Sequence, residues 1–203
     1  MLVFVLVGLP SSGKTSHGTR LMELMNIPLL ETGHAVYYEL RKHQLDATHE
    51  NTTRIIQQCL SQDPTYFLKK ILQQDFHRYD GKSALLISGV KSPNETKYLR
   101  EKFGATNVII IGFHATQKTR FLRIKNQSRH DSSRFQEKDM EDNDLSQWQN
   151  FVDRDMREIK LGIGYNLALA NEIIVTENCV WPFHSFEQSF KKFLSCVNRY
   201  LSD

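Results

Sequence analysis

Eight residues near the start of the sequence, Gly8 to Thr15, have the types and spacing of a loop that could surround a phosphate group. They read Gly-Leu-Pro-Ser-Ser-Gly-Lys-Thr, with two glycines followed by a lysine and a hydroxyl residue. The glycines leave room for backbone N–H groups to turn toward an anion, and a helix beginning near Lys14 adds its positive dipole end. Lys14 would contact the outer phosphates of a nucleoside triphosphate, and Thr15 would bind Mg²⁺. The predicted nucleotide contacts are Gly8, Ser11, Ser12, Gly13, Lys14, Thr15 and Ser16.

The flanking segments are those that such a loop needs. Residues 1–7 form a continuous apolar run rich in valine, which is typical of a central parallel strand buried on both faces. After Thr15, Leu21 and Leu24 recur at helical spacing. A glycine-rich turn that binds nothing is the alternative. A buried strand before the loop and a helix after it favour nucleotide binding.

Composition limits the classes of protein to consider. A chain of 203 residues is long enough for one domain with inserted segments, and 40% hydrophobic and 24% charged residues argue against a disordered or a membrane protein. The formal charge of +3 fits phosphate handling but gives little support for a nucleic-acid partner. The 3 cysteines show no paired spacing, so neither zinc nor disulfides are expected. Without a signal peptide or a membrane-spanning run, a cytoplasmic location is predicted.

The remaining apolar segments alternate between strand and helix patterns. Strands are predicted at 26–31, 84–87, 108–111 and 172–175, and helices at 95–103, 117–125, 148–159 and 185–200. This alternation is typical of a parallel α/β sheet. Between the second and third strands lie only helical patterns, at 35–42, 51–60 and 64–76, whereas residues 128–146 are polar and predict a mobile surface segment.

Together these features resemble P-loop nucleotide kinases. More narrowly, the chain resembles an uncharacterised, mainly archaeal kinase-like family related to dephospho-coenzyme A kinases and nucleoside monophosphate kinases. The resemblance rests on Gly8 to Thr15, His114 to Arg123, Arg129 to Asp131, and Phe151 to Ala170 with its Gly162-Ile-Gly164. It implies a three-layer α/β/α P-loop fold with a five-stranded parallel sheet. It also implies a core of residues 1–33 and 80–203, a helical acceptor-binding insert at 34–79 and a short lid at 128–147.

Arginines have a defined role in such a kinase. Phosphoryl transfer is catalysed mainly by positioning the reactants and by neutralising charge on the moving group. Lys14, Arg123 and Arg129 are therefore the predicted catalytic residues, and Arg120 is a predicted nucleotide contact. Because Arg120 and Arg123 are three residues apart on one helix, an ordinary solvated basic face is the alternative.

Two family motifs are altered in this sequence. Gly33 to Tyr37 stands where the family has Gly-Asp-x-x-Arg, and Ser88 to Lys91 stands where it has Asp-Gly-x-Arg. The expected carboxylates and the acceptor arginine are absent, although Lys91 keeps a positive charge and His34 could act as a base. Loss of a catalytic base typically lowers the rate roughly 10²–10⁴-fold. The predicted acceptor-binding residues are His34, Tyr37, Ser88 and Lys91.

Two hypotheses follow from the sequence. The first is a kinase that uses ATP and Mg²⁺ to phosphorylate a small nucleotide-like or phosphorylated acceptor. The second is a nucleotide-gated binding protein with degenerate catalytic residues. An ATPase acting with nucleic acid is less well supported, because the sequence has no concentrated basic and aromatic surface.

Overall fold

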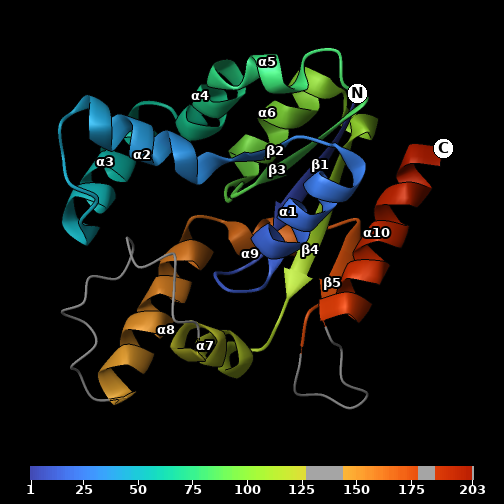
Figure 1. Cartoon of the computed structure of the whole chain (residues 1–203). Coiled ribbons are helices and arrows are strands. Elements are labelled where there is room, and N and C mark those ends of the chain that lie inside the picture. The colour runs from blue at the N-terminus through green and yellow to red at the C-terminus, as the bar shows by residue number, and fades with distance from the viewer. Residues whose placement is uncertain (127–143, 178–185, 203) are drawn as a thin grey trace.

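A computed structural model of the chain describes residues 1–126, 144–177 and 186–202. Within these residues, five strands form one sheet in the order β2-β3-β1-β4-β5, with every neighbouring pair parallel. The strands are β1 (Leu2–Val7), β2 (Leu29–Glu31), β3 (Ala84–Ser88), β4 (Val108–His114) and β5 (Glu172–Val175). The predicted five-stranded parallel α/β fold is confirmed, and β1 lies at the centre of the sheet (Figure 1).

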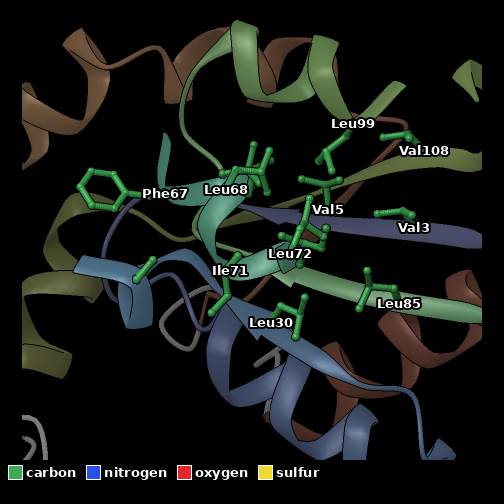
Figure 2. Close-up of a cluster of buried hydrophobic side chains, with 14 of the residues drawn as sticks. Val3, Val5, Leu30, Phe67, Leu68, Ile71, Leu72, Leu85, Leu99 and Val108 are labelled. Atoms are coloured by element: carbon green, nitrogen blue, oxygen red, sulfur yellow. The ribbon is translucent and has the colours of Figure 1, made fainter. Parts of the chain in front are cut away.

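Helices cover both faces of the sheet. On one face, Phe4 and Leu6 of β1 pack with Leu21 of α1 (Lys14–Met25) and Phe193 of α10 (Phe186–Ser202). On the other face, Val3 and Val5 belong to a cluster that includes side chains from α4 (Tyr66–Gln74) and α6 (Pro93–Phe103). Figure 2 shows Leu68 and Leu72 of α4 and Leu99 of α6 against these valines. The continuous apolar run of β1 is thus buried on both sides.

The insert between β2 and β3 is helical, as predicted. It contains α2 (Thr32–Lys42), α3 (His49–Gln62), α4 and α5 (Phe76–Tyr79). The prediction of one helix over 64–76 is wrong at both ends. Asp63 accepts hydrogen bonds from the backbone N–H and hydroxyl of Thr65, which delays the start to Tyr66. Asp75 leaves the helical conformation and separates α4 from α5.

The last part of the sheet is reached through α7 (Gln117–Asn126), α8 (Asp144–Lys160) and α9 (Ile163–Ala168). Most of the predicted lid, residues 128–143, lies outside the described residues. The last four residues of the predicted lid, 144–147, form the first turn of α8. The Trp148 ring lies 5.0 Å from the Phe121 ring and 5.7 Å from the Phe151 ring, which packs this end of α8 against α7.

The connection from β3 to β4 runs through α6 and a short 3₁₀ helix, Ala105–Asn107. The helix predicted at 95–103 ends at Phe103 as expected, and Gly104 follows it with a φ angle of 93°. Among the described residues, no helix combines the length and the apolar character needed to cross a bilayer.

Candidate functional site

The loop from Gly8 to Gly13 connects the carboxyl end of β1 to the start of α1. Strand β1 lies between β3 and β4, which is the place in an open parallel sheet where ligands usually bind. A Cβ atom on Gly8 would lie 2.5 Å from the Ser12 hydroxyl oxygen and 2.6 Å from the Phe113 carbonyl oxygen. Gly13 has a φ angle of 91° and immediately precedes α1. Both motif glycines are therefore needed for the path of the backbone.

Lys14 is the first residue of α1, and its ammonium group lies 3.5 Å from the Leu9 carbonyl oxygen across the loop. Burial lowers the pKa of Lys14 to about 8. The carboxylates of Glu158 and Glu31 oppose this decrease, whereas the cations of Lys91 and Arg154 add to it. Charged groups from α8, from the end of β2 and from the segment after β3 are thus close enough to act on one ammonium group.

Thr15, the predicted metal ligand, lies next to a carboxylate. Its hydroxyl donates a hydrogen bond to the Glu31 Oε1 atom over 3.1 Å. Glu31 is the last residue of β2, and its Oε2 atom lies 3.5 Å from Nε2 of His34. The structure therefore places a carboxylate beside the loop, although the acids expected from the family motifs are absent.

Lys91 and Glu158 form a second charged contact at this end of the sheet. Lys91 Nζ lies 2.8 Å from Glu158 Oε1, and the side chains are 33% and 16% exposed. Arg154 lies one helical turn before Glu158 on α8, so both side chains lie on the same helical face. The backbone of Lys91 is held in place, because its N–H donates to Glu95 and its carbonyl accepts from Asn166.

Arg120 and Arg123 of α7 lie behind the loop, where they hold its backbone. Arg120 is 3% exposed, forms two hydrogen bonds of 2.8 and 2.5 Å with Asp155, and donates to the Pro10 carbonyl. Arg123 donates to the Ser11 carbonyl over 3.0 Å and to the Thr176 carbonyl. Arg120 was predicted as a nucleotide contact and Arg123 as a catalytic residue. In this structure both donate hydrogen bonds to carbonyl groups of the loop.

Residues beyond β5 also support the loop. The Thr176 hydroxyl donates to the Ser12 carbonyl over 2.7 Å. His17 is buried, and its Nδ1 atom lies 2.8 Å from the Gly13 carbonyl while Nε2 lies 2.9 Å from the Ser189 hydroxyl. A carbonyl can only accept, so Nδ1 carries the proton. Burial lowers the pKa of His17.

The other predicted residues lie in different settings. Ser16 is exposed, Tyr37 is partly buried against the cluster that joins the insert to the sheet, and Arg129 lies outside the described residues. Ser12 and Ser88 are each 1% exposed, and within the described residues their hydroxyl oxygens have no hydrogen-bond partner. The structure brings Lys14, Thr15, His34 and Lys91 to one end of the sheet.

Sequence reasoning missed Glu31, Arg154 and Glu158. Arg154 and Glu158 lie within the stretch that carries the family resemblance, and their spacing of four residues is a usable signal for a shared helical face. Glu31 ends a predicted strand, but no motif assigned it a role.

A central parallel strand, a glycine-bounded loop and an enclosed lysine at the start of a helix are the features of a P-loop α/β fold. Solved structures have the same fold. A shikimate kinase from Bacteroides thetaiotaomicron aligns with a TM-score of 0.56 and 10% identity, covering 97% of this chain and 98% of that chain. TT1252 from Thermus thermophilus aligns with a TM-score of 0.60 and 13% identity, covering 98% and 97%.

The chain is also similar in sequence to archaeal UPF0200 proteins. It is 26% identical over 203 residues to one from Methanocaldococcus jannaschii, covering 98% of this chain and 87% of that protein. It is 28% identical over 199 residues to one from Pyrococcus horikoshii, covering 97% of each. No protein-family model matches the chain. The similarity to these two UPF0200 proteins thus extends over nearly the whole length of the chain.

Proposed function

We propose that the protein binds ATP at the Gly8 to Thr15 loop and transfers the γ-phosphoryl group to a small nucleotide-like or phosphorylated acceptor. The observation that carries this proposal is the charge cluster around Lys14. Lys14, Lys91 and Arg154 are three cations from separate elements, and the carboxylates of Glu31 and Glu158 only partly balance them. A polyphosphate is the ligand that such a cluster would favour.

The loop and Lys14 would bind the triphosphate and stabilise the transition state of phosphoryl transfer. The backbone N–H groups of the loop would bind the phosphates, and Lys14 would stabilise the charge that develops on the γ-phosphoryl group. The acceptor oxygen forms a bond to the γ-phosphorus atom as the bond to the β–γ bridging oxygen breaks, and ADP leaves with the electron pair. Mg²⁺, which the Thr15 hydroxyl would help to hold, neutralises charge on the β- and γ-phosphates when bound.

The acceptor would lie between the loop, the insert and α8. Lys91 and Arg154 would contact its anionic groups, and His34 and Tyr37 would approach it from α2. The structural similarity to a shikimate kinase supports a small-molecule acceptor. Since residue 37 is tyrosine and not the family's arginine, acceptor recognition in this chain would rest more heavily on Lys91 and Arg154.

Calorimetry with ATP and Mg²⁺ tests the binding step. Lys14→Ala should weaken ATP affinity at least about tenfold, which corresponds to about 1.4 kcal/mol, because the loop loses its enclosed ammonium group. Lys97→Ala is the matched control, since Lys97 is on α6 and its side chain is 76% exposed. Equal affinity in the wild type and Lys14→Ala would refute binding at this loop.

A transfer assay separates the kinase from a nucleotide-gated binding protein. The protein would be incubated with ATP labelled at the γ-phosphate and a panel of nucleoside monophosphates and dephospho-coenzyme A. Labelled acceptor is the expected product. The observation that favours the second function is the serine at position 88, because the family motif has an acid there. Tight ATP binding without transfer to any acceptor would support that binding protein.

A further inference from the structure

We infer that Glu31 supplies the carboxylate of the Mg²⁺ site, in place of the acid that the end of β3 lacks. The inference deepens the proposed function, because it concerns the metal that accompanies ATP. The two motif positions that hold acids in the family, 34 and 88, hold histidine and serine in this chain. The carboxylate would come from the end of β2, two residues before Gly33.

The first observation is the contact between Glu31 and the predicted metal ligand. The Thr15 hydroxyl lies 3.1 Å from Glu31 Oε1, so the two oxygens already face one another across the α1–β2 boundary. Glu31 also directly precedes α2, yet its side chain makes no capping hydrogen bond to that helix. Helix capping therefore does not explain the position of the carboxylate.

The second observation is independent and comes from β3. Ser88 pairs with Glu31 in the parallel register, and its hydroxyl oxygen is buried without a hydrogen-bond partner in the described part of the chain. Leu29 and Leu86, two residues earlier on each strand, pack in the cluster on the α1 side of the sheet. Because side chains alternate along a strand, Glu31 and Ser88 also point toward that side.

Three oxygen-bearing side chains thus meet near the start of α1, from Thr15, Glu31 and Ser88. Oxygen ligands are the type that Mg²⁺ prefers, and Mg²⁺ usually keeps several waters beside one or two carboxylates and the substrate phosphates. An unsatisfied buried hydroxyl is unfavourable, and a water of the metal's hydration shell would provide the partner that Ser88 lacks. His34, 3.5 Å from Glu31 Oε2, would orient the carboxylate from α2.

Metal-dependent ATP affinity tests this assignment without any acceptor. Calorimetry would give the ratio of the ATP dissociation constant in EDTA to that in Mg²⁺, which is the metal enhancement. We expect Glu31→Gln to reduce this enhancement at least tenfold. Affinity for metal-free ATP should stay the same or increase, because the variant removes a negative charge near the phosphates. Glu187→Gln is the charge-matched control, since Glu187 on α10 is 58% exposed.

A second variant makes the test independent of how the new amide packs. Glu31→Ala removes the side chain, whereas Glu31→Gln replaces the carboxylate with a neutral amide. Both variants should lose the metal enhancement of ATP affinity. Both should retain the wild-type circular dichroism spectrum, which shows that they are folded. An unchanged enhancement in either folded variant would overturn the role of Glu31. Failure of the wild type to bind ATP in either condition would instead refute the proposed function.

Discussion

Arg120 and Asp155 form a buried ion pair directly behind the Gly8 to Gly13 loop. Each side chain is 4% exposed, and Arg120 also donates to the carbonyl groups of Pro10 and Ala115. Asp155 neutralises the guanidinium where water cannot reach it. The pair thereby connects α8 to α7 and holds one side of the loop, which is a positioning role.

This role predicts a non-additive pair of substitutions. Arg120→Met should reduce the free energy of unfolding by about 3–5 kcal/mol, because it leaves the Asp155 carboxylate buried without its partner. Arg120→Met combined with Asp155→Leu should be more stable than Arg120→Met alone. Urea unfolding of both single variants, the double variant and the wild type measures the coupling. Additive losses would contradict the pair, and Lys97→Ala provides the exposed control.

At the scale of single residues, the sequence predicted the Gly8 to Thr15 motif but not the side-chain contacts around it. The Gly8 to Thr15 spacing was informative because the backbone path itself requires those residue types. The partners of Arg120 could not be predicted, because three-residue spacing shows a shared helical face but not what covers it. Glu31 could not be identified as a neighbour of Thr15, since their contact depends on how β2 enters the sheet.

At the scale of elements, the insert contains a buried carboxylate that joins two helices. Glu39 of α2 is 1% exposed and accepts a 2.8 Å hydrogen bond from the Tyr66 hydroxyl of α4. Burial alone would raise the pKa of Glu39. The Tyr66 hydrogen bond and the charges of Lys42 and Lys70 more than offset burial and hold this pKa below its ordinary value.

Because the pKa of Glu39 is lower in the folded state than in the unfolded state, its ionised carboxylate stabilises the fold at pH values above the unfolded pKa of 4.5. This contribution is lost as the pH falls through the lower pKa of the folded state. Glu39→Gln should therefore destabilise the protein by about 1–3 kcal/mol at pH 7. The difference from the wild type should decrease below pH 4.5. Chemical unfolding across this pH range measures the effect, with Glu101→Gln, 63% exposed, as the control. A pH-independent difference would count against an ionised Glu39.

The elements themselves were largely predictable from apolar periodicity. The five strands were found because each is a short apolar run, and the end of α6 at Phe103 was predicted correctly. The division between α4 and α5 was missed because the apolar pattern continues through Phe76, whereas the local conformation of Asp75 interrupts the helix.

At the scale of the whole molecule, the insert and the sheet share one apolar cluster. Val3, Val5 and Leu30 of the sheet belong to the same cluster as Ile55 of α3 and Leu68 of α4. The insert therefore has no separate core in the described residues. Unfolding it would expose one face of the central strands, so insert and sheet should unfold together.

Leu68→Ala tests this cooperativity. Leu68 is fully buried, so its truncation should lower the free energy of unfolding by about 2–5 kcal/mol without changing the dependence on urea concentration. Hydrogen exchange should show the same loss in the β1 amides and in α4. Leu24→Ala, 60% exposed on α1, should cost less than about 0.5 kcal/mol. Weakened protection in the insert alone would indicate two independent folding units.

The hydrogen bonds that hold the Gly8 to Gly13 loop come from residues that are synthesised long after the loop itself. The loop occupies residues 8–13, but its carbonyl groups accept bonds from Arg120, Arg123 and Thr176, and His17 connects it to Ser189. A ribosome makes the loop first and these partners much later. The loop therefore gains its full set of hydrogen bonds only after translation has passed β5 and entered α10.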